Sequence, residues 1–255
     1  MRALLVAGSP EPSSLALVAS LAAEADYVAA VDRGADVCHA AGIVPDAFCG
    51  DADTVSPEAM AWLRAAVPVS ADGDRETAPG LLAVTPADEV REVPEIHGLE
   101  GVRGIRLFPP AKYDTDLSLA FSCLRQVAAE EGERPEVTVT CASAGRMDHA
   151  LAVFGVLASN ADLAPRLVED GSECRVLAPS GRSAWAFGEG DVGRRFSFVA
   201  LADGTVVSER GMRWELDRYR VDALRDRGIS NVVDKTGATV TCHAGVLAVF
   251  LMRQP

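Results

Sequence analysis

The sequence YVAAVDRGADVCHAAGIVPDAFCGDAD at residues 27–53 decides the fold that we expect for this chain. An apolar run at 27–31 is followed by a short helical pattern at 35–42 and by a second apolar run at 47–49. Because parallel strands need a long crossover between them, usually a helix, this order predicts two parallel strands joined by a helix. Acidic and glycine residues follow each apolar run directly, which places polar groups at the ends of both strands.

The first 160 residues repeat this alternation of strand and helix. Further strands are expected at 4–7 and 137–141, and helices at 14–24, from 57 to about 66, from 115 onward and from 148 to about 159. Thr115 is a suitable N-cap, and apolar residues from Leu117 to Ala128 repeat at the spacing of one helix face. We therefore predict an N-terminal doubly wound, mainly parallel α/β sheet with helices on both faces.

The pattern changes after about residue 172, where short apolar runs are separated by Gly and Asp-Gly turns. The runs lie at 174–178, 183–187, 195–202, 205–207, 238–242 and 246–252. Such runs favour a small antiparallel domain, either a β-sandwich or a half-barrel, and we predict the sandwich. The predicted fold class is α/β plus all-β, with an α/β domain at 1–168 and a β-sandwich domain at 169–255. Residues 70–104 fit neither pattern and are interpreted as an insertion in the first domain.

The composition of the chain argues against several classes of binding partner. The chain has 255 residues, of which 37 are acidic and 24 basic, giving a formal charge of −13. So acidic a surface repels phosphate polymers, and we expect neither nucleic acid nor membrane as a partner. No apolar run reaches the ~20 residues that cross a bilayer, and the start of the chain lacks the long apolar region of a signal peptide. We expect a cytoplasmic protein whose six cysteines, with no C-x-x-C pair, are reduced and buried.

Charged side chains follow several expected strands, at the edge where parallel α/β sheets bind ligands. They come from four segments, which contribute Asp32, then Asp51 and Asp53, then Asp114 and Asp116, and finally Arg146, Asp148 and His149. Clustered carboxylates repel one another unless a cation lies among them, and Mg²⁺ prefers oxygen ligands. Since arginine grips phosphate, this rim predicts chemistry on a polyphosphate.

Each part of this rim also has an ordinary structural interpretation. Asp51 and Asp53 fit solvated loop acids, Asp116 fits a helix cap, and Arg146 fits a surface ion pair. The sequence contains no G-x-x-x-x-G-K-[ST] loop, no G-x-G-x-x-G fingerprint and no nucleophile elbow. The functional interpretation therefore depends on the joint occurrence of these residues at successive strand ends.

In these segments the chain resembles the thiamine pyrophosphokinase family. The family motifs D-G-G-A-N, G-I-x-P-D-x-x-x-G-D-F-D-S, K-D-x-T-D and G-G-R-x-D-H are similar to residues 32–36 (DRGAD), 42–54 (GIVPDAFCGDADT), 112–116 (KYDTD) and 144–149 (AGRMDH). Two later segments, 211–216 (GMRWEL) and 228–231 (GISN), resemble the family's G-L-x-W-x-L and terminal S-N. The likeness covers nearly the whole chain apart from 70–104.

The resemblance implies transfer of the pyrophosphoryl group of ATP to the hydroxyl of thiamine, which gives thiamine diphosphate and AMP. It implies Mg²⁺ held by Asp51, Asp53 and Asp116, and one of these acids, or Asp32, as acceptor of the alcohol proton. Arg146 would join these three as a catalytic residue by steadying the polyphosphate. The residues expected at the nucleotide are Asp32, Gly34, Thr115, Arg146, Asp148 and His149.

For thiamine, the resemblance implies a second group of residues in the β domain. Trp214 would stack on the thiamine rings, and Ser230 and Asn231 would bond the aminopyrimidine. It also implies a homodimer, with the thiamine pocket between the α/β domain of one subunit and the β domain of the other.

Three alternatives remain open at this stage. The first is a related pyrophosphokinase for another small alcohol such as a pterin, and the second is a metal-dependent hydrolase of nucleotidyl sugars or phosphates. The third is a non-catalytic homologue that binds thiamine or nucleotide. It is motivated by Tyr113, where the family usually has a carboxylate, and by Val153, where bacterial members often have Asn. Ala52 and Thr54, in place of Phe and Ser, are milder departures.

Overall fold

The computed structural model describes residues 1–66, 104–108 and 113–253. The expected insertion therefore lies outside the described residues except for Gly104, and so does Lys112. The first part of the chain contains β1 (Arg2–Val6), α1 (Leu15–Glu24), β2 (Tyr27–Val31), α2 (Gly34–Ala41), β3 (Ala47–Gly50), α3 (Pro57–Ala66), β4 (Gly104–Leu107), α4 (Asp116–Glu131), β5 (Glu136–Thr140) and α5 (Met147–Ser159). These bounds confirm the alternation predicted from the sequence.

The second part is built almost entirely of strands. They are β6 (Arg166–Glu169), β7 (Ser172–Leu177), β8 (Ala184–Ala186), β9 (Arg195–Ala200), β10 (Thr205–Arg210), β11 (Leu216–Val221), β12 (Asn231–Val232), β13 (Thr239–Ala244) and β14 (Leu247–Met252). The strands β4, β6, β11 and β12 were not predicted from the sequence.

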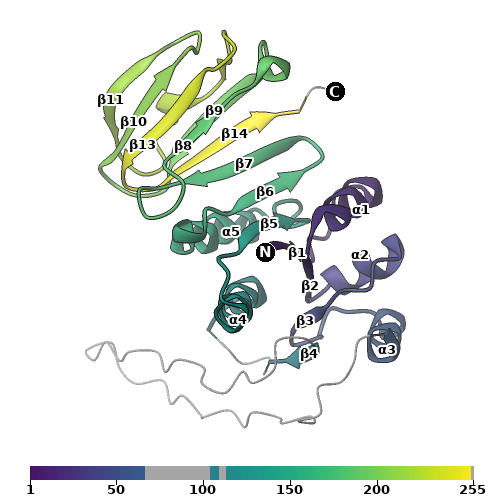
Figure 1. The fold of residues 1–255 in the computed structure, drawn as a ribbon. Coiled ribbons are helices and arrows are strands. Elements are labelled where there is room, and N and C mark those ends of the chain that lie inside the picture. Colours follow the sequence, from purple (N-terminus) through teal and green to yellow (C-terminus); the bar gives the residue numbers. More distant parts are fainter. Residues whose placement is uncertain (67–103, 109–112, 254–255) are drawn as a thin grey trace, which may run out of the picture.

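Two sheets organise these strands (Figure 1). The larger has the order β12-β9-β14-β7-β6-β5-β1-β2-β3-β4, and the smaller has the order β11-β10-β13-β8. Pairing is parallel from β6 to β4, and antiparallel from β6 through β7, β14 and β9 to β12. The mixed sheet and the separate antiparallel sheet confirm the predicted fold class. The expected boundary at 168/169 lies within β6, which pairs with β5 on one side and β7 on the other.

Helices cover both faces of the parallel half. One core contains side chains of α1, α2 and α3, and the other contains side chains of α4 and α5. The chain runs from β1 outward to β4 and then returns to β5 on the other side of β1. The loops after β1 and β5 therefore turn to opposite faces, and this switch in direction is where open α/β sheets bind ligands. A third core fills the space between the small sheet and the antiparallel half of the large one.

Capping residues explain where the helices begin and end. Thr115 Oγ1 accepts a hydrogen bond from Ser118 N at 3.2 Å, which confirms the expected N-cap of α4. The same helix ends at Gly132 in the left-handed conformation, with φ of 68°. Ser14 performs the corresponding N-cap role for α1.

All six cysteines are free and buried, as expected. Within the described residues, no helix is both long enough and apolar enough to span a bilayer.

Candidate active site

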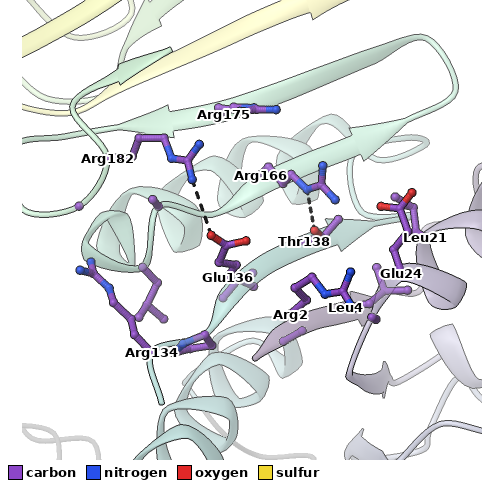
Figure 2. A pocket seen from close by; sticks show the side chains of 17 residues that line it. Arg2, Leu4, Leu21, Glu24, Arg134, Glu136, Thr138, Arg166, Arg175 and Arg182 are labelled. Atoms are coloured by element: carbon purple, nitrogen blue, oxygen red, sulfur yellow. Dashed lines mark hydrogen bonds and ion pairs between the residues drawn. The ribbon is translucent and has the colours of Figure 1, made fainter. Parts of the chain in front are cut away.

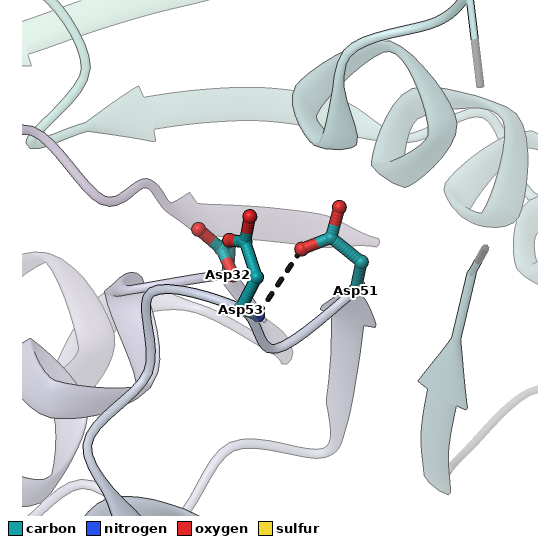
Figure 3. Close-up of side chains that lie close together, drawn as sticks. All are labelled: Asp32, Asp51 and Asp53. Carbon is teal, nitrogen blue, oxygen red and sulfur yellow. Dashed lines mark hydrogen bonds between the residues drawn. The ribbon is translucent and has the colours of Figure 1, made fainter. Parts of the chain in front are cut away.

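Three carboxylates meet beyond the carboxyl ends of β2 and β3 (Figure 3). Asp32, Asp51 and Asp53 each offer one oxygen, and these three oxygens lie within 4.8 Å of one another. Asp32 and Asp51 are half-buried, whereas Asp53 is exposed. The structure thus brings together two of the expected metal ligands with Asp32, which was assigned to the nucleotide by resemblance.

The backbone explains why these side chains converge. A Cβ at Gly50 would lie only 3.0 Å from the Cα of Asp32, so glycine allows the ends of β2 and β3 to approach closely. Ala52 then adopts a positive φ of 61°, and Asp53 N donates a hydrogen bond to Asp51 Oδ1 at 3.2 Å (Figure 3). This tight turn directs the carboxylates of Asp51 and Asp53 toward Asp32.

The oxygens of the cluster suit a hard cation. Thr54 donates its hydroxyl proton to Asp32 Oδ2. Asp32 Oδ1 is buried and has no hydrogen-bond partner in the described part of the chain. Bringing carboxylates together raises their electrostatic energy, which a divalent cation among them offsets. Because the donors are all carboxylate oxygens and one of them is buried without a partner, the residues present fit Mg²⁺.

Asp116, the third expected metal ligand, lies at a different element. It is the half-buried first residue of α4, a helix that packs against β3 and β2. It does not belong to the three-membered cluster found among the described residues. Thr115 precedes it as the N-cap, and Tyr113 is 73% exposed. Its assignment to the metal stays a prediction.

The loop after β5 presents an ion pair rather than an isolated cation. Arg146 Nη2 lies 2.5 Å from Asp148 Oδ2, and its Nε donates to Asp148 Oδ1 at 3.2 Å. The hydrogen bonds from Arg146 lower the pKa of Asp148 to about 2. Both side chains and His149 are exposed at the start of α5. Arg146 is therefore already oriented by Asp148, at the same sheet edge as the carboxylate cluster.

Glu169 at the end of β6 holds this loop in place, and the sequence analysis missed it. Its carboxylate accepts hydrogen bonds from the backbone N–H groups of Cys141 and Ala142 at 3.1 and 2.9 Å. It also accepts bonds from the Ser143 N–H at 3.1 Å and the Ser13 hydroxyl at 2.5 Å. One carboxylate thus joins the loops after β1 and β5. No local sequence signal identifies it, because its partners are all distant along the chain.

Gly34 packs the start of α2 against the end of β1. A Cβ at this position would lie 1.8 Å from the carbonyl oxygen of Val6, so no other residue fits without moving the backbone. Gly34 therefore fixes the helix that directly follows Asp32. This packing role is compatible with its predicted place at the nucleotide site, which stays a prediction.

The predicted thiamine-binding residues form a second group. Trp214, between β10 and β11, is 61% exposed, whereas Asn231 in β12 is buried. Asn231 Nδ2 donates to Trp214 O at 2.7 Å, and Asn231 Oδ1 accepts from Trp214 N at 3.2 Å. Ser230 is exposed, has a positive φ of 64°, and donates its N–H to Ser197 Oγ at 3.0 Å. The backbone of Trp214, whose indole is exposed, is therefore held by the buried side-chain amide of Asn231.

The remaining bonds of Asn231 leave its side chain fully occupied. Nδ2 also donates to Glu209 Oε2 at 3.0 Å, and Oδ1 also accepts from Val232 N at 2.8 Å. An amide side chain has two donor and two acceptor positions, and all four are used inside the protein. This geometry favours a positioning role for Asn231, through Trp214, over the predicted direct bond to the aminopyrimidine.

Glu209 is the second residue near the site that sequence reasoning missed. It is 2% exposed, and burial raises its pKa to about 7. One of its oxygens, Oε1, has no hydrogen-bond partner among the described residues. Its position in β10 of an acidic chain gave no signal that this carboxylate is buried.

The two groups of residues lie at opposite ends of the large sheet. β12, which carries Asn231, is its first strand, whereas β3 and β4 are its last two. Asp51 directly follows β3. Within one chain, the strand order therefore separates Asn231 in β12 from the carboxylate cluster after β2 and β3.

Fold and rim together define an α/β protein with a carboxylate site beyond its parallel strands and an antiparallel sandwich with an exposed tryptophan. Residues 18–167 match the family described as "Thiamin pyrophosphokinase, catalytic domain". Residues 188–247 match "Thiamin pyrophosphokinase, vitamin B1 binding domain". The chain belongs to the thiamin pyrophosphokinase family.

Solved structures of this family share the fold. Thiamine pyrophosphokinase from Bacillus subtilis is 18% identical with a TM-score of 0.70, and the match covers 100% of both chains. A thiamin pyrophosphokinase family protein from Enterococcus faecalis is 19% identical with a TM-score of 0.69, again over 100% of both chains. The enzyme from Candida albicans is 11% identical with a TM-score of 0.69, over 99% of this chain and 89% of that one. None of the curated proteins matches the chain.

Proposed function

We propose that this chain is a thiamine diphosphokinase, which transfers the pyrophosphoryl group of ATP to the hydroxyl of thiamine and releases AMP. The observation that carries the proposal is the convergence of Asp32, Asp51 and Asp53 within 4.8 Å at the carboxyl ends of β2 and β3. Family membership of both parts of the chain supports the choice of substrates.

Mg²⁺ would be held by Asp51 and Asp53, with Asp32 beside them and Asp116 as the further ligand that we predicted. When bound, it would reduce the negative charge that the thiamine hydroxyl meets at the polyphosphate. Asp32 is the carboxylate that we assign to the alcohol proton, because its Oδ1 is buried without a hydrogen-bond partner among the described residues.

The loop after β5 would orient the polyphosphate. Arg146 presents its guanidinium at the start of α5, next to Asp148. Its planar fork suits phosphate oxygens, and Asp148 limits its side-chain freedom before the nucleotide arrives. Thr115, His149 and Gly34 complete the nucleotide-binding group that we propose.

The indole of Trp214 would stack on the thiazolium of thiamine. A cation over an indole face contributes about 0.5–2 kcal/mol, and Trp214 is exposed. Asn231 would fix the loop, and Ser230 would contact the aminopyrimidine. A related pyrophosphokinase acting on a neutral alcohol such as a pterin would gain less from this contact.

We further propose that the enzyme is a homodimer. Asn231, which holds the backbone of Trp214, is in β12, at the opposite end of the large sheet from the strands that carry the carboxylate cluster. A second subunit would therefore supply the indole to the cluster. The six free, buried thiols fit a reducing compartment, and we place the protein in the cytoplasm.

The test is direct. Purified protein is incubated with thiamine, ATP and Mg²⁺, and the products are separated by chromatography. We expect equal amounts of thiamine diphosphate and AMP. Release of inorganic phosphate without thiamine diphosphate would instead identify a hydrolase, and binding without turnover would identify a non-catalytic homologue.

A further inference from the structure

A cavity of about 720 Å³ is lined by residues at the amino ends of the parallel strands, whereas the carboxylate cluster follows their carboxyl ends. Figure 2 shows the side chains that line the cavity. Arg2, Glu136 and Arg166, which line it, are the first residues of β1, β5 and β6. Asp32 and Asp51, by contrast, follow the last residues of β2 and β3. The cavity is therefore separate from the proposed active site, and its size is typical of a small-molecule site.

The cavity is rich in arginine although the chain is acidic. Its lining contains Arg2, Arg134, Arg166, Arg175 and Arg182 against two glutamates, Glu24 and Glu136. Some of this charge is already balanced, because Arg2 pairs with Asp26 at 2.8 Å and Arg175 pairs with Glu173 at 2.7 Å. Arg182 lies 3.8 Å from Glu136 (Figure 2).

Arg166 is one of the lining arginines that have no carboxylate partner among the described residues. It is half-buried, and its Nε donates to the Thr138 hydroxyl at 2.7 Å, which orients the guanidinium (Figure 2). Among the described residues, no carboxylate forms an ion pair with it. Partly buried charges are costly to leave unpaired, so this guanidinium is a binding position for an anion.

The strand register strengthens this inference. Arg166 in β6 is the direct cross-strand partner of Thr138 in β5 and of Arg175 in β7, so the three side chains share one face of the sheet. Like charges directly opposite one another on neighbouring strands are destabilising. Arg175 is kept in place by Glu173 and by the ring of Trp185, with Cζ 4.3 Å from the ring centroid. Glu173 offsets part of this repulsion at Arg175, and an anion bound between Arg166 and Arg175 would offset the charge that remains on Arg166.

We propose that this cavity binds the phosphate or diphosphate group of a small molecule, with Arg166 and Arg175 as its principal ligands and Arg182 at the rim. Arginine forks match phosphate oxygens with paired hydrogen bonds, and this needs no metal ion. The carboxylate cluster, in contrast, repels a phosphate unless a cation is present. Metal dependence therefore distinguishes the two sites.

The experiment uses the full chain in the presence of EDTA. Inorganic pyrophosphate and AMP are titrated separately into the protein by calorimetry, and the melting temperature is measured with each. We expect each probe to bind once per chain, to bind more weakly at higher salt and to raise the melting temperature. Tighter binding of AMP would identify a nucleotide as the occupant, and equal or tighter binding of pyrophosphate would identify free diphosphate.

Matched variants test the residue assignment. Arg166→Gln should weaken binding about tenfold or more, because a charge-assisted pair of bonds is lost. Arg64→Gln, which removes the same charge from an exposed position in α3, should leave binding unchanged. Arg166→Lys keeps the charge but not the fork, and should give an intermediate loss even if the glutamine variant folds poorly. Binding of neither probe, or equal binding by the wild type and both Arg166 variants, would overturn the proposal.

Discussion

The side-chain amide of Asn231 holds the backbone of Trp214 at both its carbonyl and its N–H, at 2.7 and 3.2 Å. The amide itself is buried, whereas the indole that it positions is 61% exposed. Exposed aromatic side chains on loops are usually mobile, and this one is attached to the core through its main chain. We therefore expect Asn231 to be a positioning residue that affects both stability and substrate binding.

Replacing Asn231 with alanine should therefore affect both properties. The change leaves the Trp214 backbone and the Glu209 carboxylate without buried partners, and should cost about 1–3 kcal/mol of unfolding free energy. We expect the KM for thiamine to rise several-fold while the KM for ATP stays nearly constant. Urea unfolding and steady-state kinetics measure the two effects. Thr236→Ala, at an exposed position before β13, is the control; a parallel rise in both KM values would contradict the positioning role.

Replacing Trp214 with alanine tests stacking directly. A cation–π contact of about 0.5–2 kcal/mol predicts a loss of thiamine affinity of roughly 2- to 30-fold, with little change for ATP. Because the variant lacks the tryptophan whose fluorescence would report thiamine, binding should be measured by calorimetry. Tyr219→Ala, which removes another exposed ring, in the neighbouring strand β11, is the matched control. Equal losses for thiamine and ATP would argue against the stacked arrangement.

Replacing Asp51 with asparagine should abolish transfer while leaving the fold intact. The amide keeps the size of the side chain but removes the charge that would hold Mg²⁺. Loss of several kcal/mol of transition-state stabilisation lowers the rate by more than about 100-fold. Circular dichroism checks the fold, and coupled AMP release measures the rate. Asp217→Asn, at an exposed ion pair with Arg210, provides the control for charge alone. Full activity of the Asp51 variant would exclude the metal role.

Glu209 should make stability depend on pH. Burial raises its pKa from 4.5 to about 7, so the unfolded chain loses this proton at lower pH than the folded protein does. The stability due to the neutral carboxyl is therefore fully present below pH 4.5 and is lost as the pH rises to about 7. The difference corresponds to about 3 kcal/mol.

Glu209→Gln removes this titration and retains an acceptor for Asn231. We expect the variant to be more stable than the wild type at pH 8 and similar to it at pH 4, as measured by urea unfolding at both values. A difference between the two proteins that does not change with pH would show that Glu209 titrates normally.

The sequence predicted the parallel half of the fold well because its strands are apolar runs bounded by capping residues and glycines. It missed β11 because most side chains of that strand are exposed, so no alternation of apolar and polar residues marks it. β12 contains only two residues, and β6 has charged residues at both ends, so neither forms an apolar run like the one that marks β3. β4 begins at Gly104, inside the segment interpreted as an insertion.

The site was predicted in part for similar reasons. Asp51 and Asp53 are found from their place after a strand, and their contact with Asp32 follows from the pairing of β2 with β3. Glu169 and Glu209 act through partners far away in the chain, so only the tertiary structure identifies them. The occupied amide of Asn231 likewise depends on contacts that no local motif specifies.

Asn231, which holds the backbone of Trp214, and the carboxylate cluster lie at opposite ends of the large sheet, and this has a consequence for mixed assemblies. In the proposed dimer, each active centre combines Asp51 of one subunit with Trp214 of the other. When a subunit without Asp51 pairs with a subunit without Trp214, both losses fall in the same centre, and the second centre keeps both residues. Refolding the two defective proteins together should therefore restore about a quarter of wild-type turnover, because random pairing makes half of the dimers hybrids with one intact centre each. Recovery of activity from two defective variants would show that each active centre contains residues of both subunits.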